Sequence, residues 1–229
     1  MRGNREEKAT GGKGKATSAL RLLARVLVGL PLLLVAWHSA VRLVRHFHKF
    51  PMPQFLASLI DNPLRRRIQP PDDMAVRHGL EQGMQVLEIG PGNGTYTLGA
   101  ARCVGPAGRL VAVDIEPRMV ERVRRRAEAE GAANVDVHLA DATHLPFADE
   151  TFDAAYMITV MGEIPDPVQA LREVYRVLSP QGTLACSEVL LDPDYPLPLT
   201  LERWAEQAGF RLRQKLGNLW CYTLLFAKA

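Results

Sequence analysis

The sequence predicts an α/β fold with a doubly wound, mostly parallel sheet. Three observations predict it: short apolar runs alternate with helix-like segments, a glycine-rich turn follows the first run, and an acidic residue ends the second. Strands that alternate with helices form βαβ units, whose helices cover both faces of a parallel sheet. The chain has 229 residues, 47% of them hydrophobic, which is enough for one domain with a full core.

The expected strands are short runs rich in apolar and β-branched residues. They cover residues 85–89, 109–114, 135–139, 152–158 and 182–189. Helices are expected at residues 95–103, 117–130 and 167–178, with Pro117 in the first turn of the second helix and Gly131 at its end. After a helix at 199–208, residues 210–216 and 219–227 are expected to form an antiparallel hairpin across Gly217 and Asn218. The result is a seven-stranded sheet with an antiparallel edge.

The most informative stretch is residues 86–95, where an apolar strand ends in the closely spaced glycines Gly90, Gly92 and Gly94. Glycine accepts positive φ and lets backbone N–H groups approach a ligand, so this pattern predicts a turn that holds a nucleotide cofactor. A dinucleotide-binding unit would have its third glycine one residue later. Asp114, at the end of the second strand, is placed to accept hydrogen bonds from the ribose of any ribose-containing cofactor, so it does not distinguish a dinucleotide from another nucleotide cofactor.

The run Glu-x-Gly-x-Gly-x-Gly from Glu88 to Gly94, followed by Asp114, resembles the class I methyltransferases that use S-adenosyl-L-methionine on a Rossmann-like sheet. The similarity continues through Asp141-Ala142 after the third strand and Leu145-Pro146-Phe147 before the fourth, and one departure is Gln181-Gly182 where the family commonly has Gly-Gly. Residues 72–229 are accordingly expected to be a methyltransferase domain. Within the family, the chain is most similar to the C-methyltransferases of quinone biosynthesis.

The resemblance implies a site for S-adenosyl-L-methionine at the carboxyl ends of the strands. The expected cofactor-binding residues are Glu88, Gly90, Pro91, Gly92, Asn93, Gly94, Asp114, Ile115, Asp141, Ala142 and Met157. The glycines would face the methionine part, while Asp114 would accept from the ribose and Asp141 from the adenine amine. For each acidic residue the alternative is a structural role as a helix cap or turn residue.

Methyl transfer from a sulfonium needs the two reactants aligned in a dry site rather than a protein nucleophile. If a base assists, the titratable residues near the end of the fourth strand are Glu163, Tyr156 and His144. We expect Glu163, and the alternative for it is a loop carboxylate in solvent. Residues 46–71 mix apolar and basic side chains and are expected to form an amphipathic linker or lid, which predicts a small, lipophilic acceptor at a membrane surface. The alternatives are a protein or nucleic-acid methyltransferase, or a non-catalytic membrane scaffold that binds the cofactor.

The N-terminal region is expected to comprise a basic disordered tail at 1–18 and a hydrophobic, membrane-associating helix at 19–45. Residues 26–41 carry no charged side chain, but as a helix of about 24 Å they are short for about 30 Å of hydrocarbon. Basic residues on both sides and a cytosolic cofactor favour an in-plane or re-entrant helix, with the catalytic domain facing the cytoplasm. A cleaved signal peptide and a helix that covers the domain are the alternatives.

Other classes of site receive little support from the sequence. Cys103, Cys186 and Cys221 are odd in number and lack Cys-x-x-Cys spacing, so we expect reduced thiols. His46 and His48 have no third ligand nearby, so no metal site is expected. The basic tail lacks interleaved aromatic residues, so no nucleic-acid partner is expected either.

Overall fold

The computed structural model describes residues 29, 36, 39–40, 67, 69–190 and 192–229. The chain divides into two compact units, residues 1–48 and 49–229. The second unit carries all the strands of the sheet described below.

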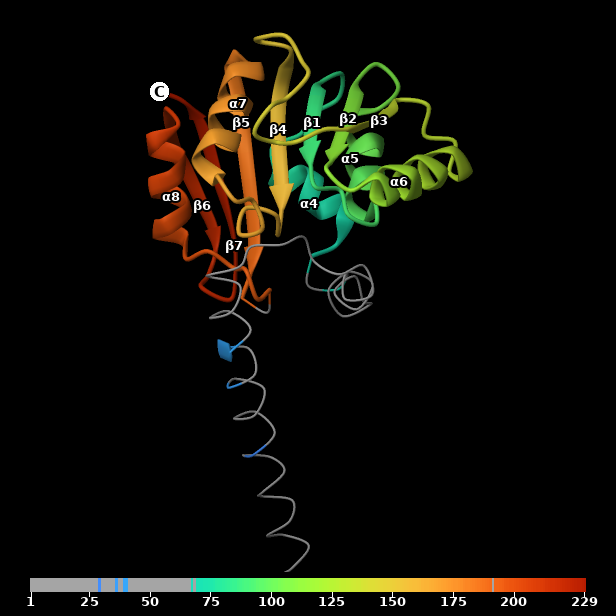
Figure 1. Ribbon diagram of the computed structural model, residues 1–229. Helices are drawn as coiled ribbons and strands as arrows, with labels where there is room; N and C mark the ends of the chain where they lie inside the picture. The colour runs from blue at the N-terminus through green and yellow to red at the C-terminus, as the bar shows by residue number, and fades with distance from the viewer. Residues whose placement is uncertain (1–28, 30–35, 37–38, 41–66, 68, 191) are drawn as a thin grey trace, which may run out of the picture. The chain divides into compact units, whose positions relative to one another are not determined.

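Seven strands form one sheet in the order β3-β2-β1-β4-β5-β7-β6 (Figure 1). They are β1 (Gln85–Ile89), β2 (Arg109–Asp114), β3 (Val135–Leu139), β4 (Phe152–Ile158), β5 (Leu178–Val189), β6 (Phe210–Gly217) and β7 (Cys221–Lys228). Strands β1 to β5 pair in parallel, whereas β7 pairs antiparallel with both β5 and β6. The predicted fold class is confirmed, including the antiparallel C-terminal hairpin.

The helices of this unit are α4 (Pro71–Arg77), α5 (Thr95–Val104), α6 (Pro117–Ala129), α7 (Pro167–Val177) and α8 (Pro198–Gln207). All except α5 begin with proline, whose fixed φ and missing N–H suit the first helical position. The side chain of Asp166 caps α7 by accepting a hydrogen bond of 3.0 Å from the backbone N–H of Gln169. The helix α5 instead begins after Gly94, which has a left-handed backbone conformation.

Two helical layers cover the sheet because successive side chains of each strand point to opposite faces. On one face, Val86 and Ala154 pack in a cluster with residues of α4 and α5. On the other, Leu87 and Ala155 pack with residues of α7 and α8. By this alternation the side chain of Glu88 lies on the α4/α5 face. Although it is ionisable, it is as buried as its apolar neighbours in β1.

Two local features differ from the expectations, and the order of the last two strands was left open by them. The helix α4 was not expected, because its seven residues are too few to show a helical period. Strand β5 begins at Leu178 rather than at 182, and its pairing with β4 has a register irregularity between Phe152 and Ala154. Strand β7 lies between β5 and β6, so β6 rather than β7 forms the edge of the sheet.

The expected tail at 1–18 lies outside the described residues, and so do most of the hydrophobic helix at 19–45 and of the lid at 46–71. Within the part of the chain that the structure describes, no helix combines the length and apolar character needed to cross a bilayer. The longest helix there, α6, has 13 residues, or about 20 Å against about 30 Å of hydrocarbon. The prediction of a membrane-associated protein whose catalytic domain faces the cytoplasm is corrected by this finding.

Candidate functional site

The sheet reverses its strand order between β1 and β4, which are neighbours, and open α/β sheets bind ligands at such a point beyond the carboxyl ends of the strands. The glycine loop lies there. Gly90, Gly92 and Gly94 have φ values of 69°, 53° and 73°, which residues with a side chain rarely adopt. A Cβ on Gly92 would meet open space, so the backbone of the loop is accessible at this position.

Gly90 has a second reason to lack a side chain. An added Cβ would lie 2.5 Å from a methyl carbon of Val160, in the loop that follows β4. Real Cβ atoms do not approach other atoms so closely, so glycine at this position lets the loops after β1 and β4 pack together. A third loop joins them, because a Cβ on Gly162 would lie 1.8 Å from the backbone oxygen of Asp194 in the segment after β5.

Two arginines of α6 hold the glycine loop from outside. Arg122 donates a hydrogen bond of 2.7 Å to Oδ1 of Asn93. Arg126 donates to the backbone oxygen of Asn93 at 3.0 Å and to Oγ1 of Thr95 at 3.3 Å. The helix that follows β2 therefore fixes the loop that follows β1.

Asp114 joins the same two regions at the end of β2. Its Oδ1 accepts a hydrogen bond of 2.9 Å from the backbone N–H of Glu116. Burial raises the pKa of Asp114, and the backbone N–H groups of Glu116 and Gly92 oppose that rise. Ile115, the next residue, leaves 59% of its surface exposed and so offers an apolar contact beside the carboxylate.

The remaining predicted site residues differ in their exposure to solvent. Asp141 is exposed and accepts a hydrogen bond of 2.8 Å from the backbone N–H of Thr143, which is the turn role weighed above as its alternative. Ala142 is half-buried beside it. Met157 is fully buried in the cluster under α7 and α8. Glu163 is half-buried after β4, and its N–H donates to the backbone oxygen of Val160 at 3.0 Å.

Glu88 is the most perturbed of the predicted residues. Only 3% of its surface is exposed, and burial raises its pKa from 4.5 to about 7. The nearby hydroxyls of Thr97 and Tyr156 lower this pKa, and the charge of Asp114 raises it. Sequence analysis did not place Thr97 or Tyr156 beside Glu88, because each becomes its neighbour only through the packing of α5 and the pairing of β4 with β1.

These features fit a nucleoside cofactor that carries a cationic amino-acid end. The glycines leave the backbone bare, Asp114 supplies a carboxylate at the end of β2, and Oε2 of Glu88 is a buried acceptor without a hydrogen-bond partner among the described residues. A buried acceptor of this kind is costly unless a ligand or water satisfies it. The donor and acceptor set therefore suits S-adenosyl-L-methionine.

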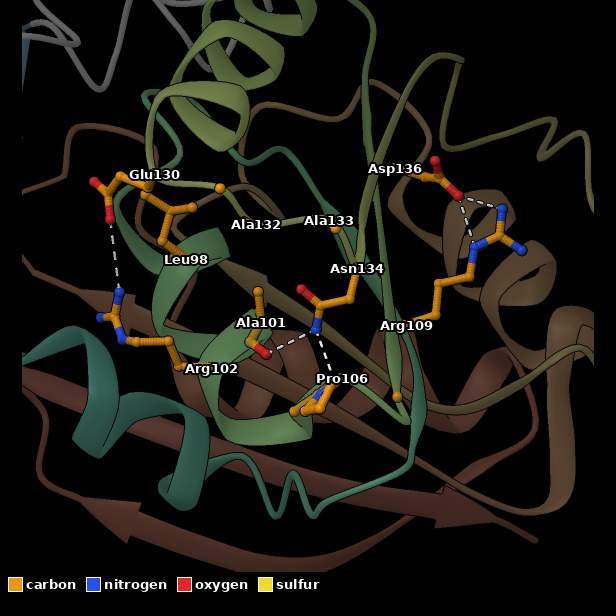
Figure 2. Close-up of a pocket in the computed structure, with 13 residues that line it drawn as sticks. Leu98, Ala101, Arg102, Pro106, Arg109, Glu130, Ala132, Ala133, Asn134 and Asp136 are labelled. Atoms are coloured by element: carbon orange, nitrogen blue, oxygen red, sulfur yellow. Dashed lines mark hydrogen bonds and ion pairs between the residues drawn. The ribbon is translucent and has the colours of Figure 1, made fainter.

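A hollow of about 650 Å³ lies away from the glycine loop, at the opposite edge of the sheet, where β2 and β3 begin (Figure 2). Its charged groups are already engaged, since Arg102 pairs with Glu130 and Arg109 pairs with Asp136. The amide nitrogen of Asn134 donates to the backbone oxygens of Ala101 and Gly105, each at 2.9 Å. These contacts join α5 to β3, which is a structural role.

Comparison with known proteins identifies the family of this chain. Residues 80–221 match the model of a family described as a methyltransferase domain. The ubiquinone/menaquinone biosynthesis C-methyltransferase UbiE of Klebsiella pneumoniae is 33% identical over 142 residues, which cover 62% of this chain and 55% of that protein. An arsenite methyltransferase of Halobacterium salinarum is 34% identical over 114 residues, covering 50% of this chain and 29% of that protein. The chain thus spans about half or less of these curated relatives.

A solved structure supports the fold. The crystal structure of a SAM-dependent methyltransferase from Aquifex aeolicus superposes with a TM-score of 0.72 at 24% sequence identity. The match covers 77% of this chain and 98% of that one.

Proposed function

Since the chain belongs to the methyltransferase domain family, we propose that it is an S-adenosyl-L-methionine-dependent methyltransferase whose acceptor is a small, lipophilic molecule of the quinone-precursor class. The name of the UbiE relative supports the chemical class. The observation that carries the proposal is an exposed apolar surface beside the carboxyl end of β5, described next.

The apolar surface comprises four side chains that are more than half exposed. They are Leu197, Leu199, Leu219 and Trp220. Hydrogen bonds join the two segments that carry them: the Tyr195 hydroxyl donates to the backbone oxygen of Leu219 at 2.5 Å, and the N–H of Leu190 donates to the backbone oxygen of Trp220 at 2.8 Å. Large apolar side chains gathered on a surface indicate an interaction site, and this one suits a hydrocarbon tail.

We propose the following roles for the cofactor residues. The backbone of Gly90–Gly94 faces the methionine part, with Pro91 and Asn93 setting the path of the loop. Asp114 accepts from the ribose hydroxyls, Ile115 contacts the base, and Asp141 and Ala142 meet its amino edge. Met157 acts through its backbone, because its side chain is enclosed in the core.

When bound, the cofactor supplies a methyl group activated by its sulfonium. The protein has to align that group with the acceptor and exclude water, which gives most of the acceleration in such a displacement. Packing among the loops after β1, β4 and β5, at Gly90 with Val160 and at Gly162 with Asp194, fixes the walls of the site. For an acceptor that must lose a proton, we propose Glu163 as the base, on account of its position after β4.

The acceptor proposal predicts a preference for molecules with a tail. Initial rates with demethylated quinol headgroups should give kcat/KM about tenfold higher for an isoprenoid-tailed acceptor than for a tail-less one, since each buried methylene contributes about 0.8 kcal/mol. Leu219→Ser should reduce this preference and leave the rate on the tail-less acceptor unchanged. The tail-less acceptor is the internal control, because a substitution that only disturbs the fold lowers both rates and leaves their ratio unchanged.

Equal rates on tailed and tail-less acceptors, or on polar acceptors, would contradict the lipophilic class while leaving the methyltransferase activity intact. Methylation of a purified protein or nucleic acid in place of the small molecule would favour the alternative enzyme class.

The proposed ribose contact predicts that Asp114→Ala weakens binding of S-adenosylhomocysteine by about 1–3 kcal/mol, or about 5- to 150-fold. Calorimetric titration measures the affinity directly. Asp136→Ala is a suitable control, because Asp136 also lies in a strand of the sheet but pairs with Arg109 at the opposite edge. An affinity that Asp114→Ala leaves unchanged would remove Asp114 from the cofactor site.

A further inference from the structure

A row of buried polar side chains crosses the face of the sheet that α4 and α5 cover. The row lies on four neighbouring strands and includes one residue from each covering segment, and every member is at most 3% exposed. Its members are Glu88 on β1, Tyr156 on β4, Ser187 on β5, Thr223 on β7, Thr97 on α5 and His78 directly after α4. Polar groups are rare in such a core unless they serve one another or a ligand.

The half of this row near β7 is satisfied internally. Nε2 of His78 lies 2.8 Å from Oγ of Ser187, which lies 2.7 Å from Oγ1 of Thr223. Burial, with a smaller contribution from the charge of Arg77, lowers the pKa of His78 to about 3, so its ring is neutral. That neutral ring stacks on Tyr156 with centroids 5.1 Å apart.

The half near the glycine loop is not satisfied. Oε2 of Glu88, Oγ1 of Thr97 and the hydroxyl of Tyr156 have no hydrogen-bond partner among the described residues. The three groups are nevertheless close. Glu88 and Tyr156 are register partners on neighbouring strands. The hydroxyls of Thr97 and Tyr156 lie near enough to the carboxyl of Glu88 to lower its pKa and so favour its ionised form. Two hydroxyl donors thus face a carboxylate that still lacks a partner on one oxygen.

Among the described residues, the groups that shift the pKa of Glu88 include no cation. Asp114 on β2 repels its negative charge, the hydroxyls of Thr97 and Tyr156 are neutral, and His78 behind Tyr156 is neutral. A cationic group placed beside this carboxyl would therefore stabilise its ionised form. S-adenosyl-L-methionine carries an ammonium group at the end that the glycine loop is proposed to hold.

We propose that Thr97 and Tyr156 are positioning residues, whose hydroxyls direct the Glu88 carboxyl toward the ammonium group of the cofactor and favour its ionised form, so that the fraction of Glu88 that is protonated in the free protein releases its proton to solvent when the cofactor binds. This inference rests on the proposed placement of the methionine end beside Glu88. The O–H bond of the protonated carboxyl breaks, the electron pair stays on the carboxylate, and the proton goes to the buffer. No other group changes its bonding.

Calorimetry with S-adenosylhomocysteine, which keeps the ammonium group, tests the proposal without turnover. In buffers of different ionisation enthalpy near pH 6.5, the wild-type protein should release a fraction of a proton on binding, and its affinity should rise between pH 6 and pH 8. In Thr97→Val and Tyr156→Phe that rise should move to higher pH, with affinity at pH 7 lower by about tenfold. Thr97→Ser should restore the wild-type profile, because it keeps the hydroxyl.

Glu88→Gln should bind without releasing that proton. Proton release that persists in Glu88→Gln would come from the ligand and would overturn the proposal, as would unchanged pH profiles in both hydroxyl-deleted variants. Thermal unfolding of each variant identifies any that fail to fold, and Thr97→Ser together with Glu88→Gln then carries the test. Wild-type binding without any pH dependence refutes this inference alone, whereas absence of binding refutes the cofactor placement on which it rests.

Discussion

Glutamine at position 88 should stabilise the folded protein increasingly as the pH rises, by about 3 kcal/mol more at pH 8 than at pH 4. The reason is that burial raises the pKa of Glu88 to about 7 from an ordinary value of 4.5. Between these two values the folded protein binds more protons than the unfolded chain does. Its free energy of unfolding therefore falls with rising pH through this window, and the loss stays constant above about pH 7.

A neutral glutamine has no such titration, so the difference between the variant and the wild type isolates the contribution of Glu88. Urea unfolding at half-unit steps from pH 4 to pH 8 measures it. Glu206→Gln is the control, because it makes the same chemical change at an exposed position on α8. A difference for Glu88→Gln that is flat with pH would show that Glu88 is ionised at ordinary pH in the folded protein.

Alanine at position 92 should reduce the affinity for S-adenosylhomocysteine by about a hundredfold or more. The new Cβ would enter the open space beside the loop, which is where the proposed cofactor lies, without touching the protein. Displaced ligand contacts worth about 3 kcal/mol correspond to this factor. The cost to folding should be only that of a side chain at φ of 53°, about 1 kcal/mol.

Gly131→Ala separates these two effects. Gly131 has φ of 64°, and its added Cβ also meets nothing within 4 Å, but it follows α6 at the far edge of the sheet. Both variants should therefore lose similar thermal stability, whereas only Gly92→Ala should lose cofactor binding. Equal ligand affinities in the two variants would place the cofactor away from the glycine loop.

The centre of the sheet was predictable from the sequence because β1, β2 and β4 are buried on both faces over most of their length and therefore appear as largely apolar runs. Residues 109–114 illustrate this, since the four residues between Arg109 and Asp114 are all buried. The start of β5 was not predictable, because Pro180 and Gly182 favour a turn, yet the segment pairs with β4 after a register irregularity. Only the three-dimensional pairing overrides that local signal.

The candidate site was predictable to the extent that its residues are contiguous or follow strands. The glycine loop and Asp114 are of this kind, and the structure brings them together through the backbone N–H of Gly92. The position of Thr97 and Tyr156 beside Glu88 was not predictable, because a threonine in a helix and a tyrosine in an apolar strand carry no sign that they meet a buried carboxylate. The hydrogen bonds of the α6 arginines to Asn93 were likewise not predictable, because these arginines lie among many other charged residues in an amphipathic segment.

The position of β7 has a consequence for synthesis on the ribosome. Strands β1 to β5 emerge first, and until residues 221–228 follow, the nascent chain exposes an unpaired edge along β5. Strand β6 emerges before β7 but, among the described strands, pairs only with β7, so it cannot cover that edge by itself. Chaperones that recognise open strand edges therefore have a defined interval in which to act on this protein, which closes when its most C-terminal strand is inserted.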